Sequence, residues 1–137
     1  MKKLFIVCIA ALFTLISCAG GNKEMNGTWT TSQLNYMGEN IDLVKSEITI
    51  EINGSKANIN GHSGVNRFFG EVKINKDKII FGDQVGMTKM MGDPVSQNFE
   101  DKFIETLMHS DDCDLQDDIL IIKNTKNNSY IKFTKNK

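Results

Sequence analysis

The chain has 137 residues and a formal net charge of −1, and 40% of its residues are hydrophobic while 24% are charged. A chain of this length is one domain and buries roughly two-thirds of its extended surface without help from metal ions or disulfides. The sequence has no basic stripe with interleaved aromatic residues, so we expect no nucleic-acid partner.

The first residues are organised like a bacterial secretion signal. Lys2 and Lys3 precede the apolar run 4–12, which is too short to span a bilayer as a helix. Residues 15–18 (Leu-Ile-Ser-Cys) resemble the lipobox, in which the thiol, here that of Cys18, receives a diacylglyceryl group and becomes the mature amino terminus. We therefore predict a signal peptide over 1–17, a lipidated tether over 18–25 and a folded domain over 26–137. The alternative is an ordinary signal peptide cut near Ala19, which leaves a secreted soluble protein.

Lipidation of Cys18 predicts a membrane partner reached through the lipid anchor. Two or three acyl chains attach a protein stably, because each buried CH₂ contributes about 0.8 kcal/mol. The extended tether reaches only about 25 Å, so the domain lies close to the bilayer. No aspartate follows Cys18, which in related systems implies sorting to the outer membrane of the bacterial cell envelope; the leaflet stays open. Cys8 leaves with the signal peptide, so beside Cys18 the mature chain keeps Cys113, and we expect no internal disulfide.

The first half of the domain alternates apolar and polar residues with a period of two, which is typical of strands. Residues 28–36 predict the first strand or strand pair, in which Trp29 anchors the core with its indole N–H bonded to a carbonyl. Residues 47–53 and 56–60 predict a hairpin that turns at Gly54, with the isoleucines of the first strand facing inward. Further strands are expected over 68–74 and 79–81, in an antiparallel sheet with one wet face.

The pattern changes to a helical period at Asp93 and Pro94, which fit the N-cap and the first helical position. One amphipathic helix is predicted over about 94–109. Its expected apolar stripe consists of Val95, Phe99, Phe103, Ile104, Leu107 and Met108. Glu100 and Asp101 lie toward the start of the helix, where negative charge is favourable.

Three short strands, at about 112–116, 119–123 and 129–134, are expected to end the chain. Together these elements predict a mainly β fold with one helix, in the α+β class. The antiparallel meander is expected to form a small open or closed barrel packed on the single amphipathic helix.

A glycine-rich stretch, residues 61–70, separates two of the predicted strands. Gly61, Gly64 and Gly70 suit tight turns, bulges or close backbone approach, and Asn66 tolerates left-handed geometry. The stretch is either a structural corner or a binding site, in which Arg67 and the neighbouring His62 are the residues with chemistry to offer.

The pattern Gly-x-Ser-Gly-x-Asn-Arg-Phe-x-Gly at 61–70, then a short strand, then Thr-x-Met at Thr88 and Met90, then an acidic and aromatic helix, resembles the META domain family, which includes HslJ-like heat-shock lipoproteins. The resemblance runs from about residue 26 to 133 and implies a β-meander or cracked barrel plugged by one helix. In that family cysteines usually stand where Val65 and Gly92 stand here. Their joint absence is expected if the two family cysteines face each other, and it excludes a redox role for that pair in this chain.

The sequence gives little support for a catalytic site or a metal-binding site. The aspartates at 111, 112, 114, 117 and 118 lack the glycine and glutamate positions of a calcium loop, and the two histidines give no zinc pattern. His62 and Ser63 are adjacent on a strand and point to opposite faces, so they do not form a nucleophile and base pair. We expect neither an enzyme nor a cofactor.

Three function classes stay open. The first is a META-type envelope lipoprotein that acts as a non-catalytic, stress-related or partner-binding module. The second is a carrier or chaperone of an apolar ligand or a partner's segment, similar to pilotin-like cracked barrels, with Met87, Met90 and Met91 at the mouth. The third is an inhibitor of a wall-degrading enzyme, with Arg67 inserted into the active site.

Overall fold

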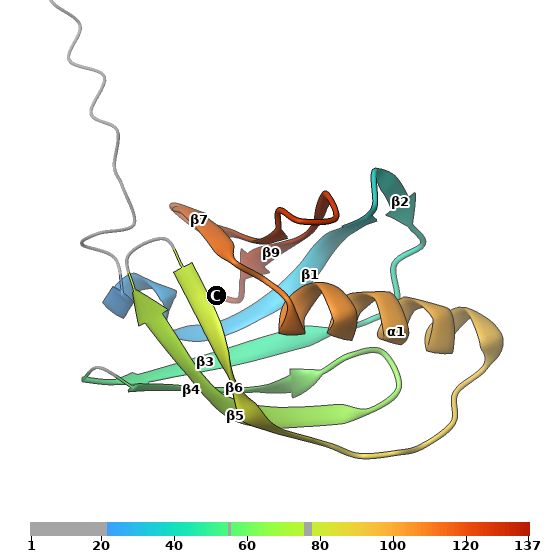
Figure 1. The fold of residues 1–137 in the computed structure, drawn as a ribbon, viewed down its shortest axis with the longest axis horizontal. Helices are drawn as coiled ribbons and strands as arrows, with labels where there is room; N and C mark the ends of the chain where they lie inside the picture. Colours follow the sequence, from blue (N-terminus) through green and yellow to red (C-terminus); the bar gives the residue numbers. More distant parts are fainter. Residues whose placement is uncertain (1–21, 55, 76–77) are drawn as a thin grey trace, which may run out of the picture.

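The computed structural model describes residues 22–137 except 55, 76 and 77, so the predicted signal peptide and Cys18 lie outside the described residues. In the described residues, one antiparallel sheet curls into a half-barrel around one α-helix, α1 (Pro94–Met108) (Figure 1). The predicted class, mainly β with one helix, is confirmed. Within the described part of the chain, no helix is both long and apolar enough to cross a bilayer.

The sheet has nine strands and follows a short 3₁₀ helix, η2 (Asn22–Met25). The strands are β1 (Gly27–Tyr36), β2 (Glu39–Ile41), β3 (Glu47–Asn53), β4 (Lys56–His62), β5 (Arg67–Asn75), β6 (Lys78–Met87), β7 (Asp112–Gln116), β8 (Ile119–Asn124) and β9 (Ser129–Lys135). Their order is β6-β5-β4-β3-β1-β9-β8-β7, with β2 paired to β1. All pairs are antiparallel, and β6 and β7 form the two ends of the order, so the barrel is open.

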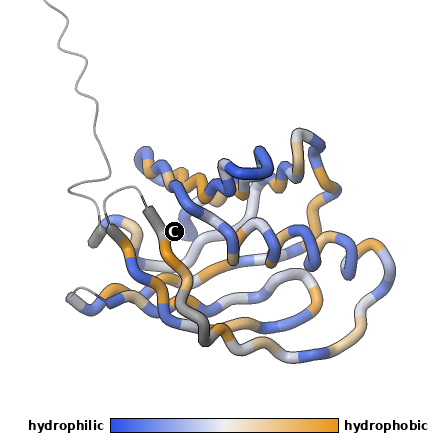
Figure 2. The backbone as a smooth tube through the Cα atoms, in the orientation of Figure 1, coloured by the Kyte–Doolittle hydropathy of each residue, from blue (hydrophilic) through white to orange (hydrophobic). Residues whose placement is uncertain are grey.

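Alternation along the strands creates the core, and Figure 2 shows hydrophobic and hydrophilic residues alternating along the chain. The helix contributes Phe99 and Phe103, whose rings stack with centroids 5.7 Å apart. Phe103 also meets Phe133 of β9 edge-on at 6.1 Å. The indole N–H of Trp29 donates to the Met25 carbonyl at 2.9 Å, as predicted.

Two details differ from the sequence-based expectation at the strands. β2 was not predicted; it follows a tight turn at Met37 and Gly38, both with positive φ (53° and 90°). β6 has ten residues and not three, because it continues past a register shift opposite Gly70 and Val72. A bulge of this kind interrupts the period-two pattern and hides the strand's true length.

The helix begins at Pro94 as predicted, and the side chain of Asp93 accepts from the backbone N–H groups of Val95 and Ser96. Val95, however, was expected in the buried stripe and is 60% exposed. Its helical turn lies beside Asn40, Ile41 and Asp42, where Val95 lines a shallow cleft outside the core.

Candidate functional site

The glycine-rich stretch runs from the end of β4 to the start of β5 and contacts both α1 and the segment after β6. Gly61 pairs with Ile48 across the sheet, and a Cβ at this glycine would lie 2.2 Å from the Glu47 carbonyl oxygen. Gly64 has φ +109°, and a Cβ at this position would lie 3.1 Å from Cδ1 of Phe99. Both positions therefore require glycine for backbone reasons, one for close approach and the other for its left-handed conformation.

Glu100 of α1 is the centre of this region, although its side chain is buried. Its Oε2 accepts from the Ser63 hydroxyl (2.6 Å) and from the backbone N–H groups of Val65 (3.1 Å) and Asn66 (2.6 Å). Its Oε1 accepts from Asn66 Nδ2 at 2.6 Å. Both carboxylate oxygens are thus used to hold the 63–66 loop on the helix.

Asn66 extends these contacts to the segment after β6. Its Oδ1 accepts from the Thr88 hydroxyl (3.0 Å) and from the Met90 N–H (2.6 Å), and its Nδ2 also donates to the Met90 carbonyl (3.0 Å). The Thr88 hydroxyl oxygen in turn accepts from the backbone N–H of Arg67 at 3.0 Å. We call the set Ser63, Val65, Asn66, Thr88, Met90 and Glu100 the Glu100 network. It joins two loops and the helix through polar contacts across sequence separations of 22 to 37 residues.

The electrostatics of Glu100 follow from these contacts. Burial by itself raises the pKa of this carboxyl, because the charged form is desolvated. The hydrogen bonds from Ser63, Asn66 and Val65 favour the charged form and outweigh burial, so the pKa of Glu100 lies below its ordinary value of 4.5. Glu100 is therefore an ionised, hydrogen-bonded carboxylate at neutral pH.

The remaining residues of the motif lie apart from this network. Gly70 pairs with Ile59 and Val85 and adjoins the register shift in β5 and β6. The Arg67 side chain is exposed and lines a cleft of about 300 Å³ together with Lys45, Glu47 and His62. The structure thus joins Asn66, Thr88 and Met90 but leaves the Arg67 side chain outside.

Val65 and Gly92 lie side by side. A Cβ at Gly92 would be 2.4 Å from Val65 Cγ2 and 3.4 Å from Val65 Cβ. The Val65 side chain therefore occupies the space that a side chain at position 92 would need. This is the arrangement that the family resemblance implied for its two cysteines.

Glu100 was missed by the sequence analysis, which assigned it only to the charge balance of the helix start. A signal was present: Glu100 lies three residues before Phe103 and next to Phe99, on the apolar face of the helix. A charged residue within an apolar stripe has to be hydrogen-bonded when buried, so its position alone indicated polar partners from another segment.

The acidic cluster near β7 uses its carboxylates locally. Asp111 accepts from the N–H and hydroxyl of Thr125, and Asp112 and Asp114 both pair with Lys123. Among the described residues, no group of three or more His, Cys, Asp or Glu is arranged to hold a metal ion. Cys113 is fully buried in β7.

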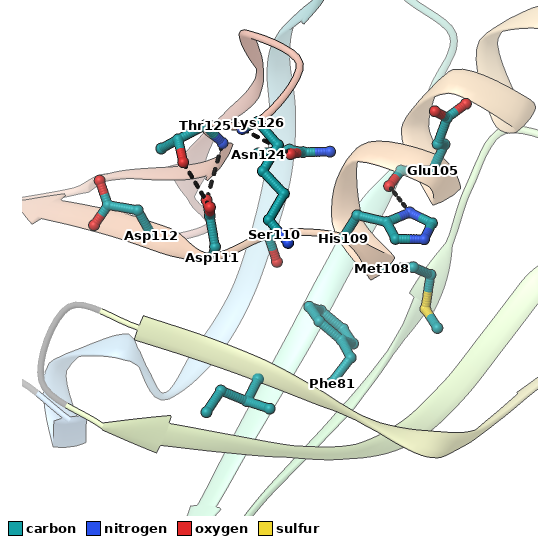
Figure 3. Close-up of a pocket in the computed structure, with 11 residues that line it drawn as sticks. Phe81, Glu105, Met108, His109, Ser110, Asp111, Asp112, Asn124, Thr125 and Lys126 are labelled. Atoms are coloured by element: carbon teal, nitrogen blue, oxygen red, sulfur yellow. Dashed lines mark hydrogen bonds between the residues drawn. The ribbon is translucent and has the colours of Figure 1, made fainter.

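The methionines proposed for a ligand mouth differ in their exposure. Met91 is 94% exposed, Met90 is also exposed, and Met87 packs partly on the core. Three clefts at the described surface, one of which Figure 3 shows, are lined by other residues. The space inside the half-barrel is occupied by large buried side chains, among them Trp29 and Phe68.

Comparison with solved structures shows the fold in two other proteins. A protein from Burkholderia xenovorans, solved by NMR, is 18% identical with a TM-score of 0.71, over 86% of this chain and 88% of that one. A DUF4847 family protein from Bacteroides vulgatus, solved by crystallography, is 16% identical with a TM-score of 0.59, over 82% of this chain and 94% of the other. No curated protein matches the sequence.

The family model for the META domain matches residues 22–137, which include the whole Glu100 network. That match covers most of the chain. The protein therefore belongs to the META domain family.

Proposed function

We propose that this protein is a lipoprotein of the bacterial cell envelope, anchored through Cys18 in the outer membrane, whose META domain acts by binding a partner and not by catalysis. A stress-related role belongs to the same proposal, on the resemblance to HslJ-like lipoproteins. The observation that supports the non-catalytic half is the Glu100 network, because the polar residues of the motif in it are buried and hydrogen-bonded to one another.

The polar atoms of the network bind one another. Ser63 and Glu100 are buried, and the Ser63 hydroxyl donates to a carboxylate that already accepts three further hydrogen bonds. A nucleophile must reach its substrate, and a general base must be able to take its proton. The contacts of these residues instead fix two loops on α1, which supports a structural role for the motif and leaves function to the surface.

The anchoring half rests on the lipobox-like residues 15–18 and on the position of the domain's start. η2 lies at the opposite end of the half-barrel from the β4–β5 loop and from the start of α1 (Figure 1). A short lipidated tether would keep the η2 end beside the bilayer. The Glu100 network and the exposed Met90 and Met91 would then face away from the membrane.

No specific observation favours the carrier alternative or the inhibitor alternative. Met87, Met90 and Met91 line none of the three clefts described above, and Met90 and Met91 are exposed. Arg67 is exposed, but it shares its cleft with the acidic Glu47, so the cleft does not present an unopposed basic probe.

The anchoring test uses Cys18→Ala with Cys8→Ala as the matched control, since only Cys18 occupies the lipobox position. We expect the unaltered protein and Cys8→Ala to take up a radiolabelled or alkyne-tagged fatty acid and to fractionate with membranes. Cys18→Ala should take up no lipid and keep a longer, unprocessed chain. Equal labelling and fractionation of all three proteins would remove the lipoprotein half of the proposal.

A further inference from the structure

Three Asn-Gly dipeptides occur in the chain, at 26–27, 53–54 and 60–61. Asparagine before glycine is open to spontaneous deamidation, because glycine carries no side chain that hinders attack by its own amide nitrogen. That nitrogen attacks the side-chain carbon Cγ of the asparagine, the C–N bond to the amide group breaks and ammonia leaves, which gives a five-membered succinimide. Water then opens one of the two C–N bonds of the ring and leaves aspartate or isoaspartate. The three sites share this chemistry, so differences between them have to come from the fold.

Exposure of the asparagine side chain does not separate the three sites. Asn26, Asn53 and Asn60 are all exposed. The glycines differ, because Gly54 is exposed while Gly61 is buried. Ring closure also needs rotation of the asparagine backbone, since the extended conformation (ψ about +135°) holds the next nitrogen away from the side chain. A site therefore reacts when the peptide after the asparagine is free to turn.

The dipeptide at 60–61 lies inside the sheet. β4 has a paired strand on each side, and Gly61 lies opposite Ile48 of β3 and Phe68 of β5. Whichever neighbour its N–H faces, that group belongs to a hydrogen-bonded ladder. A Cβ at Gly61 would lie 2.2 Å from the Glu47 carbonyl oxygen, so the backbone is also closely packed. Rotation of the peptide between Asn60 and Gly61 thus requires opening of the sheet.

The dipeptide at 26–27 is held by its asparagine side chain. Asn26 Oδ1 accepts from the Ile52 N–H at 3.0 Å, and Gly27 pairs with Ile50. This hydrogen bond fixes the carboxamide on β3, so it must break before Cγ approaches the Gly27 nitrogen. The site is therefore protected by a contact that joins β3 to the residue before β1.

The dipeptide at 53–54 lies at the end of a hairpin. Asn53 is the last residue of β3, and its partner across the hairpin is Lys56. The ladder between β3 and β1 has already ended at Ile50. Gly54 starts the turn with φ +66°, and no atom of the described chain beyond its two neighbours lies within 4 Å of a Cβ built there. Rotation of this peptide disturbs only the last pair of the hairpin, and the ends of elements open at low free-energy cost.

We propose that Asn53 is a deamidation site of the folded protein, at which water replaces ammonia to give aspartate or isoaspartate, while the fold protects Asn26 and Asn60. The product places a carboxylate opposite Lys56, and opposite charges across a strand pair are favourable. The turn between β3 and β4 lies at the same end of the half-barrel as η2 (Figure 1). With the proposed anchor, the surface beside the bilayer therefore gains one negative charge as the molecule ages.

The test measures deamidation at the three sites in one sample. Full-length protein in a neutral detergent is incubated in mildly alkaline buffer made with H₂¹⁸O and is then digested with trypsin in mildly acidic, ordinary water. Trypsin gives the peptides 24–45, 46–56 and 57–67, each with one Asn-Gly dipeptide. Hydrolysis of a succinimide during the incubation leaves ¹⁸O in the new carboxyl group, so mass spectrometry separates it from deamidation during digestion. We expect ¹⁸O to accumulate in 46–56 at least about tenfold faster than at the dipeptides of the other two peptides, because those sites need local opening.

Two controls show whether the fold is the cause. In guanidinium chloride the three dipeptides should take up ¹⁸O at similar rates, because the unfolded chain leaves only the shared Asn-Gly chemistry. Asn53→Gln should abolish labelling of 46–56, since glutamine has to form a less favourable six-membered ring. Asn60→Gln is its matched control and should leave that labelling unchanged. An isoaspartyl methyltransferase should methylate 46–56 from the incubated unaltered protein but not from Asn53→Gln.

Three outcomes overturn the proposal. They are labelling of 46–56 that is no faster than that of 57–67 in the folded protein, the same ratio of rates in the folded and the unfolded protein, and label in 46–56 that persists in Asn53→Gln. The Cys18→Ala protein should give the same ratio as the unaltered protein, because the rates depend on the fold and not on the anchor. Failure of the deamidation test therefore leaves the lipoprotein proposal in place, and failure of lipidation leaves the deamidation result interpretable.

Discussion

Glu100 is a buried carboxylate with no basic side chain among its hydrogen-bond partners. Four donors stabilise it, three of them on Oε2 and one on Oε1. Hydrogen bonds to a charged group contribute more than neutral ones, and each buried donor left without an acceptor costs about 1–3 kcal/mol. The residue therefore matters through its partners on the loop and not through an ion pair.

Substitution of Glu100 tests this directly. Glu100→Ala removes the acceptor of four donors and should lower the free energy of unfolding by about 3–5 kcal/mol. Glu100→Gln keeps the shape but turns an amide N–H₂ toward a donor, and should cost about 2–3 kcal/mol. Urea denaturation followed by Trp29 fluorescence measures both. Asp101→Ala, on the exposed side of α1, is the control and should stay within about 0.5 kcal/mol; equal losses at positions 100 and 101 would contradict the role assigned to the network.

At the scale of elements, the loop after β4 and the segment before α1 are packed together at Val65 and Gly92. The distance of 3.4 Å between Val65 Cβ and the Cβ position of Gly92 is close to the range of about 3.5–4.5 Å found in disulfides. In this chain the branched side chain of Val65 packs against the backbone of Gly92. A side chain added at position 92 must displace the Val65 side chain. If Val65 is itself replaced by cysteine, a cysteine at position 92 is placed to form a disulfide with it.

A pair of substitutions separates these two outcomes. Gly92→Cys alone should destabilise the protein by about 1–3 kcal/mol, since its Cβ overlaps the Val65 side chain. Val65→Cys combined with Gly92→Cys should form a disulfide, and the oxidised protein should be about 3–4 kcal/mol more stable than its reduced form for a loop of this length. Thiol titration and urea midpoints with and without reductant measure the effect. A double variant that keeps both new thiols after oxidation would contradict the observed juxtaposition.

At the scale of the whole molecule, three carboxylates in different regions all have lowered pKa values in the folded protein, so each of them stabilises the folded state when it is ionised. The pKa of Glu100 is lowered by the loop, that of Asp93 by hydrogen bonds from Ser96, and that of Asp111 by hydrogen bonds from Thr125. The unfolded chain, whose carboxyls have ordinary pKa values of 4.5 and 3.8, takes up protons before the folded one as the pH falls. These groups therefore contribute stability that is complete above about pH 5 and is lost as the pH falls through their folded pKa values.

The expected result is a free energy of unfolding that is flat between about pH 6 and 8 and falls steadily below about pH 4.5. Glu100→Gln should reduce this slope, because it removes one of the groups with a lowered pKa. Urea titrations at several pH values measure the slope for the unaltered protein and the variant. Identical slopes for the two proteins would show that Glu100 does not titrate with folding.

The sequence by itself determined the elements whose causes are local. The alternation in 47–53 and 56–60, the cap formed by Asp93 and Pro94, and the three final strands were predicted within a few residues, because strand period and helix capping are set by neighbours in the chain. The glycine requirements at Gly61 and Gly64 were also recognised in kind. Tertiary structure alone decided the role of Glu100, the exposure of Val95 and the placement of β6 and β7 at the two ends of the sheet. Each of these depends on segments far apart in the sequence, such as Ser63 and Glu100, and no local pattern specifies which distant groups will meet.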